Sequence, residues 1–128
     1  MHRSLFLLPM LALALSAPVA MAADQKKVVY FPTWSAELDD PARAVIDEAA
    51  TQARDHDKAA VTVAGFASTI GSPRANQLLS ELRAQVVADY LMRKGVRAGR
   101  LRLNSRGASH FVSTPLESRR VEVTIAGR

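Results

Sequence analysis

The chain has no cysteine among its 128 residues. Disulfide bonds, thiolate metal ligands, a cysteine nucleophile and a thiol-linked lipid are therefore all excluded. Internal repeats and low-complexity segments are also absent, and the length is that of one domain. Aromatic residues are few, at 5% of the chain, and include a single tryptophan, Trp34. We expect one domain that folds around a modest core without covalent crosslinks.

One long apolar run is present, and it lies at the N-terminus. A short basic start precedes apolar residues 5–15, and a small-residue tail with an Ala-x-Ala pattern follows. These features predict a secretory signal peptide at residues 1–22. The run is short for a bilayer and contains a proline, which disfavours the alternative of an uncleaved membrane anchor. We expect residues 23–128 to form a periplasmic domain, either soluble or peripherally associated with the outer membrane or the cell wall.

Charge is distributed unevenly along the chain. Residues 23–57 carry 4 basic and 8 acidic side chains, whereas residues 58–128 carry 12 basic and 4 acidic ones. A basic half indicates an anionic partner, and nucleic acid is not expected for an exported protein. The asymmetry also favours docking on another envelope protein or a weak homodimer, with a monomer as the alternative. For most of these arginines, a solvated surface position is the simpler interpretation.

Periodicity predicts an α+β fold with the order βαβαββ. Alternating apolar residues indicate four strands, at 28–31, 60–66, 101–105 and 119–126. Asp39 and Ser72, each followed closely by a proline, predict the starts of two helices. The first should end near Arg54 and the second before Gly95. We expect a mixed four-stranded sheet with both helices packed on one face and the last two strands paired antiparallel.

The second helix combines an apolar stripe with a polar turn at its start. The stripe comprises Leu79, Leu82, Val86 and Tyr90, with Val87 and Leu91 beside them. We expect this stripe to face the core, and Arg83 borders it. A guanidinium near the core is costly unless it is paired, and the alternative is that its head reaches water. The backbone N–H groups of the turn at 67–72 predict an anion site.

No constellation of catalytic residues is present. Outside the leader the histidines are His56 and His110, and His110 lies in a Ser-rich loop without a nearby carboxylate. Ser80 lies on a helix and not in a G-x-S-x-G elbow. Metal-ligand spacing is absent as well. An enzyme is therefore not expected, and neither is a metal or another cofactor.

Three motifs, in the right order, resemble those of one known family. They are Asn76-x-x-Leu79-Ser80-x-x-Arg83-Ala84, the turn Gly65-Phe66-Ala67-Ser68-Thr69-Ile70-Gly71-Ser72, and Glu117-Ser118-Arg119-Arg120-Val121-Glu122. Together they resemble the OmpA-like (OmpA/MotB C-terminal) peptidoglycan-binding domain over about residues 28–126. The resemblance implies the βαβαββ fold and non-covalent binding of peptidoglycan through the diaminopimelate of its stem peptide.

The resemblance also implies roles for particular residues. In the family an Asp in the turn pairs with the ammonium group of the ligand, and the Arg that matches Arg83 binds its carboxylate. The Asn that matches Asn76 helps to hold the turn, and the pair matching Arg119 and Arg120 lines the far wall. This chain has Ser68 where the family has the Asp. A neutral hydrogen bond contributes about 1 kcal/mol against about 1.5–3 kcal/mol for a charged one, so we expect roughly tenfold weaker binding.

Two functions remain open from the sequence. The first is a periplasmic peptidoglycan-binding module weakened by Ser68. The second is an OmpA-like scaffold that has lost wall binding and serves as a structural or protein-interaction part of an envelope assembly. Trp34 follows the first strand, near the expected site. It is either a stacking surface for a sugar or stem peptide, or a cap on the core.

Overall fold

The computed structural model describes residues 23–107 and 118–127. The predicted signal peptide at 1–22, and the segment 108–117 that contains His110, lie outside the described residues. The elements, in chain order, are β1 (Gln25–Tyr30), α1 (Asp40–Asp55), β2 (Val61–Gly65), α2 (Pro73–Arg93), the short 3-10 helix η1 (Ala98–Arg100), β3 (Leu101–Ser105) and β4 (Arg120–Ile125). The predicted order βαβαββ is confirmed, with η1 as a small addition.

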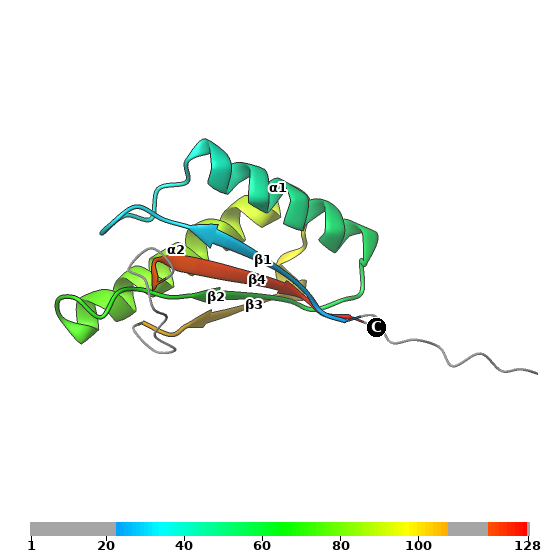
Figure 1. The fold of residues 1–128 in the computed structure, drawn as a ribbon. Helices are drawn as coiled ribbons and strands as arrows, with labels where there is room; N and C mark the ends of the chain where they lie inside the picture. Colours follow the sequence, from blue (N-terminus) through cyan, green and yellow to red (C-terminus); the bar gives the residue numbers. More distant parts are fainter. Residues whose placement is uncertain (1–22, 108–117, 128) are drawn as a thin grey trace, which may run out of the picture.

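The four strands form one mixed sheet in the order β1-β4-β2-β3 (Figure 1). β4 runs antiparallel to both of its neighbours, β1 and β2, and β2 runs parallel to β3. The predicted mixed sheet is confirmed, but the expected pairing of the last two strands is wrong. β4 takes an interior position because Val121, Val123 and Ile125 supply a fully buried face. Leu103 of β3 stays 42% exposed, which suits a strand at the edge.

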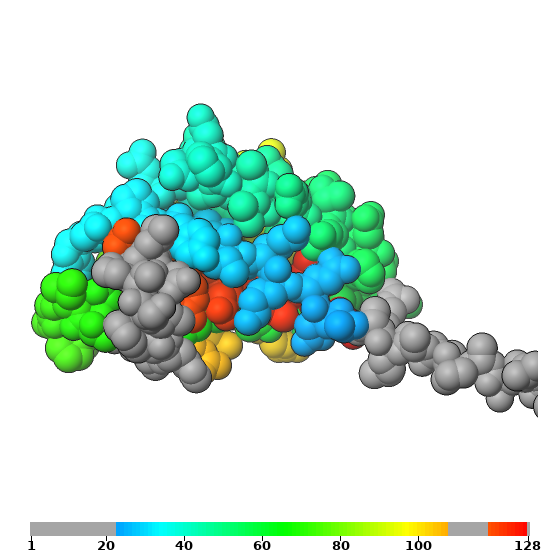
Figure 2. Space-filling view, viewed as in Figure 1, coloured from blue at the N-terminus to red at the C-terminus, as the bar shows by residue number. Residues whose placement is uncertain are grey.

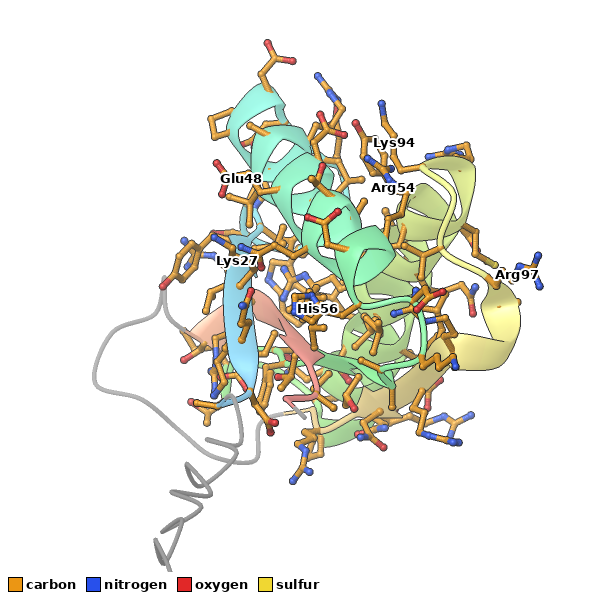
Figure 3. All side chains as sticks on the ribbon, turned by 90° about the vertical axis from the view of Figure 1, so that its right-hand side faces the viewer. Lys27, Glu48, Arg54, His56, Lys94 and Arg97 are labelled. Atoms are coloured by element: carbon orange, nitrogen blue, oxygen red, sulfur yellow. The ribbon has the colours of Figure 1, made fainter. Side chains whose placement is uncertain are left out.

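Both helices pack on the same face of the sheet, as predicted. α1 lies over β1 and β4, and α2 lies over β2, β3 and β4 (Figure 1). Lys27 of β1 donates to Glu48 of α1 at 3.2 Å, and Figure 3 shows these two side chains next to each other. Among the described residues, no helix has both the length and the apolar composition needed to cross a membrane.

Local sequence explains where each helix starts. The Asp39 side chain accepts a hydrogen bond from Ala42 N at 2.8 Å, and the Ser72 side chain accepts one from Ala75 N at 2.9 Å. Each helix also has a proline in its first turn, where the missing N–H group leaves no intrahelical bond unmade. The predicted starts are confirmed, and the second one places a polar turn at the N-terminus of α2.

α2 buries only part of the apolar stripe that the sequence predicts. Its buried residues are Asn76, Ser80, Arg83, Ala84, Val87, Ala88 and Leu91. Val87 and Leu91 of the expected stripe are buried as predicted, and Leu79, Val86 and Tyr90 are half-buried. Leu82 is 53% exposed, so its predicted place in the core is wrong. The reason is a close backbone contact, because a Cβ on Gly65 would lie 2.0 Å from Ser80 O. At this distance small residues fit between helix and strand, and Leu78 and Leu82 face outward.

Candidate functional site

A pocket of about 220 Å³ opens where the loop after β1, the turn before α2 and the residue before β4 meet. Its lining residues are Thr33, Trp34, Ser68, Ile70, Asn76, Leu79, Arg83 and Arg119. All the residues expected at the site except Arg120 are in this lining. In Figure 2 the loop after β1 in cyan, the start of α2 in green and the entry to β4 in orange lie together at the left-hand end of the molecule.

Arg83 is fully buried, and its guanidinium donates hydrogen bonds to three backbone carbonyl groups. Nε lies 2.8 Å from Ser35 O, Nη1 lies 3.2 Å from Phe66 O, and Nη2 lies 3.0 Å from Pro32 O. The guanidinium carbon also lies 5.3 Å from the centroid of the Phe31 ring. Arg83 therefore holds the loop after β1 against the end of β2. Because a guanidinium has more N–H groups than these three bonds use, donors remain for a ligand.

The positive charge of Arg83 is not neutralised by a nearby acid. No carboxylate in the part of the chain that the structure describes forms a salt bridge with it. Burial, and to a smaller extent the charge of Arg119, lower the pKa of Arg83 from its ordinary value to about 10. Arg83 thus stays cationic at neutral pH, and two like charges border one pocket. An anion would relieve their repulsion, so the pocket suits a carboxylate.

Arg119 supplies the second charge and keeps most of its hydrogen-bond donors. Its Nε donates to Phe31 O at 3.1 Å, which fixes the side chain at the end of β1. Its two terminal nitrogens form no hydrogen bond or salt bridge with residues 23–107 or 118–127. A planar guanidinium with two open nitrogens has the geometry for bidentate binding of a carboxylate.

The turn between β2 and α2 forms another wall of the pocket. Ser68 Oγ accepts a hydrogen bond from Ile70 N at 3.0 Å. Asn76 Nδ2 donates to Ile70 O at 2.8 Å and to Ser72 O at 3.1 Å, so this side chain closes the turn from the start of α2. Asn76 Oδ1 is buried and has no hydrogen-bond partner among the described residues. The turn thus brings a hydroxyl group, and no carboxylate, to the lining.

Trp34 forms an outer part of the pocket. It is 53% exposed, so the interpretation of this residue as a cap on the core does not fit. Its indole lies against the turn before α2, where a Cβ on Gly71 would be 2.9 Å from Trp34 Cη2. Its backbone φ is 51°, a left-handed conformation that is unusual for a bulky residue. Such strain is found where a side chain has to be held in one position, as in ligand sites.

Arg120 lies away from the pocket, although it is adjacent to Arg119 in the motif. It is the first residue of β4 and lies with Glu122 and Thr124 on the face of the sheet opposite the helices. Its Nε is 3.2 Å from Glu122 Oε1, and its guanidinium carbon is 3.8 Å from the centroid of the Phe66 ring. The expected shared wall of Arg119 and Arg120 is not found, because consecutive residues entering a strand point to opposite faces.

Three lining residues are not predicted by the sequence, namely Thr33, Ile70 and Leu79. Ile70 is 66% exposed, and Leu79 is half-buried beside it in the lining. The sequence does contain one signal, since an isoleucine is unexpected in a turn built otherwise from Gly, Ser and Thr. These residues add apolar surface next to the two guanidinium groups.

Comparison with known proteins agrees with this geometry. The model of the OmpA family matches residues 30–122. The chain is 37% identical over 90 residues to outer membrane protein A of Shimwellia blattae, and the match covers 69% of this chain but 37% of that protein. The OmpA-like domain of FopA1 from Francisella tularensis subsp. tularensis SCHU S4 has a TM-score of 0.73 at 25% identity, covering 82% of this chain and 76% of that one.

A second solved structure extends the comparison. The cell wall anchor of the T6SS from Pseudomonas aeruginosa has a TM-score of 0.67 at 27% identity, covering 85% of this chain and 87% of that one. The chain spans little more than a third of the length of the Shimwellia relative, so that similarity concerns one domain. The resemblance predicted from the motifs is confirmed by the family match over most of the described residues. The chain belongs to the OmpA family.

Proposed function

We propose that this domain binds peptidoglycan non-covalently in the periplasm, through the diaminopimelate of a stem peptide. The observation that carries the proposal is the convergence of Arg83 and Arg119 on one pocket whose described lining contains no carboxylate. Family membership supports it, because the Pseudomonas aeruginosa relative at 27% identity is a cell wall anchor. We propose recognition without catalysis, since the part of the lining that the structure describes contains no paired nucleophile and base.

The lining residues divide into a polar and an apolar group. The terminal nitrogens of Arg119 and the remaining N–H groups of Arg83 bind the ligand carboxylate. Trp34 and Ile70 are both more than half exposed, and they cover the methylene groups of the ligand. This arrangement fits a short carbon chain that ends in a carboxylate.

Ser68 makes this binding weaker than an aspartate at the same position would. Its hydroxyl already accepts from Ile70 N and cannot offer an ammonium group a charged partner. Since charged hydrogen bonds exceed neutral ones by about 1–2 kcal/mol, we propose an affinity roughly tenfold below that of the Ser68→Asp variant. Wall association would then be reversible.

A second function is favoured by one observation. Three donors of Arg83 are used by backbone carbonyl groups, so this residue also has a purely structural role. The domain could therefore have kept Arg83 for its fold and lost the wall ligand. In that case it would be a structural or protein-interaction component of an envelope assembly.

The charge asymmetry of the chain is partly neutralised within the fold. Glu48 is paired with Lys27 at 3.2 Å and Asp47 with Lys94 at 3.4 Å, so the acidic face of α1 is less available for another molecule. Figure 3 shows the Lys27 and Glu48 side chains next to each other, and neither residue is in the lining of the pocket. We therefore propose a monomer or a weak homodimer, with any protein partner bound by a surface other than this paired one.

The test is co-sedimentation of residues 23–128, which contain every described element, with diaminopimelate-type sacculi. Arg119→Ala removes one pocket charge and leaves the Arg83 bonds in place. Arg97→Ala is the matched control, because Arg97 is exposed, lies outside the pocket lining and carries the same charge (Figure 3). We expect the wild type and Arg97→Ala to pellet and Arg119→Ala to stay in the supernatant.

Two results would contradict this function. If the wild type and Arg119→Ala pellet equally, the wall is bound elsewhere on the domain. If the wild type stays in the supernatant and Ser68→Asp pellets, the scaffold has lost its wall ligand and the second function holds.

A further inference from the structure

We propose that the pocket recognises a carboxylate without requiring an ammonium group beside it, so that its ligands include diaminopimelate whose adjacent amine is acylated. This inference rests on the proposed function and concerns the same site. At its free end diaminopimelate carries a carboxylate and an ammonium group on one carbon. When that amine forms a cross-link to a neighbouring stem peptide it becomes an amide, and the carboxylate remains. The pocket would therefore bind cross-linked as well as uncross-linked wall.

The polar groups of the lining are mostly donors. Arg83 and Arg119 can only donate hydrogen bonds. Ser68 Oγ accepts one bond, from Ile70 N at 3.0 Å, which leaves its O–H group to donate and one neutral lone pair to accept. An O–H donor matches a carboxylate or an amide carbonyl group, whereas an ammonium group can only donate and needs acceptors. The lining thus favours ligand oxygens over ligand ammonium.

The acceptors of the described lining are neutral hydroxyl and amide oxygens, which suit a charged ammonium group poorly. Asn76 Oδ1 lacks a partner, but it is buried behind the turn that its own Nδ2 closes through Ile70 O and Ser72 O. It is also neutral, so it does not compensate for the lost hydration of an ammonium ion. No carboxylate lines the pocket among the residues that the structure describes.

The charge of the pocket opposes an ammonium group directly. Arg83 and Arg119 both line the pocket, and the positive charge of Arg119 contributes to the lowered pKa of Arg83. An ammonium group would add a third positive charge to the same space. Acylation removes that charge and keeps the carboxylate that both arginines can bind. The acyl group also adds apolar surface, which Trp34 and Ile70 can cover at the mouth of the pocket.

The test compares two probes, meso-diaminopimelate and its mono-N-acetyl derivative, by calorimetric titration of residues 23–128. We expect the wild type to bind the acetylated probe at least as tightly as the free one. Ser68→Asp adds an anion to the lining and should reverse the order, with about a tenfold preference for the free probe. Thr69→Asp is the matched control, because Thr69 is exposed in the same turn and lies outside the lining.

The outcomes separate this inference from the proposed function. If the wild type pellets with sacculi yet binds the free probe about tenfold more tightly than the acetylated one, wall binding stands and the inference is overturned. If the wild type neither pellets nor binds either probe, both are overturned. If Thr69→Asp changes the preference as much as Ser68→Asp does, general charge and not the lining sets the selectivity, which also overturns the inference.

Discussion

The indole of Trp34 lies so close to Gly71 that a Cβ there would be 2.9 Å from Trp34 Cη2. Trp34 belongs to the loop after β1, whereas Gly71 belongs to the turn before α2, so the contact joins the two segments that border the pocket. Both residues have positive φ, 51° for Trp34 and 90° for Gly71. Each of the two segments that meet at this wall of the pocket therefore contains one residue with a backbone conformation that few residues adopt.

Gly71→Ala should weaken ligand binding and destabilise the fold. The new methyl group would displace Trp34, and alanine at a positive φ costs about 1–2 kcal/mol. Chemical denaturation measures the free energy of unfolding, and co-sedimentation with sacculi measures binding. Gly99→Ala is the control, because nothing lies within 4 Å of its added Cβ. Equal binding by both variants would show that the Trp34 position is not needed.

The fluorescence of Trp34 should report on the pocket. It is the one tryptophan of the chain and is 53% exposed, so its emission in the free protein should be that of a solvated indole. A ligand that covers the ring should shift the emission to shorter wavelength. The shift should saturate with the same dissociation constant as a calorimetric titration. Emission that does not change while the ligand binds would place the ligand away from Trp34.

Gly65→Ala should be more damaging than its small size suggests. Its Cβ would lie 2.0 Å from Ser80 O, which is backbone and cannot rotate away. α2 would have to move off β2, and overpacking of this kind costs about 1–3 kcal/mol or more. Urea denaturation should show a lower midpoint than for Gly99→Ala. A midpoint equal to that of the wild type would contradict the close approach of α2 to the sheet.

Substitution of Arg83 should reduce the stability of the fold much more than substitution of Arg119. Arg83→Ala removes three buried hydrogen bonds from a charged donor to backbone carbonyl groups, and each such bond contributes about 1–3 kcal/mol, so we expect a loss of several kcal/mol in the free energy of unfolding. Arg119→Ala removes one such bond, to Phe31 O, and should cost about 1 kcal/mol. Thermal unfolding of both variants checks this order. Equal losses would show that the Arg83 bonds contribute little.

Carboxylate binding should decrease at high pH. The pKa of Arg83 is lowered to about 10, chiefly by burial, so its charge is present below this pH and is lost as the pH rises through it. Pimelate is the suitable probe, because it has carboxylates and no amine. We expect the dissociation constant of pimelate to stay the same from about pH 7 to 9 and to rise above pH 10. In the complex the pKa of Arg83 should be higher than in the free protein, because the bound anion favours the charged guanidinium.

The contribution of Arg83 to the free energy of unfolding should increase with pH, whereas its contribution to carboxylate binding decreases. The pKa of Arg83 in the folded protein, about 10, lies below its ordinary value, so at pH values between the two the unfolded chain holds more protons. The contribution of Arg83 to the free energy of unfolding therefore rises with pH in that range. Circular dichroism at each pH shows whether the fold is intact while binding is measured. A dissociation constant that stays flat to about pH 11 would show that Arg83 does not bind the probe.

The starts of the helices and the order of the elements are encoded locally. Asp39 and Ser72 cap their own helices through bonds three residues along the chain, so the sequence predicts them without the rest of the fold. The alternation in β4 likewise follows from the period of a strand. The motifs also predict four residues of the pocket from the sequence. These residues, Ser68, Asn76, Arg83 and Arg119, lie in segments whose order and spacing resemble those of one family.

The contacts that define the site are long-range, and only the tertiary structure decides them. Which face of α2 is buried depends on Gly65 and its contact with Ser80 O, so the helix period alone places Leu82 wrongly in the core. Arg83 bonds to carbonyl groups of Pro32 and Phe66, which lie far from it in the sequence. Local sequence sets the backbone dihedral angles and the periodicity of each helix and strand. Which side chains meet is set by the packing of one backbone segment on another, and this packing depends on the whole chain.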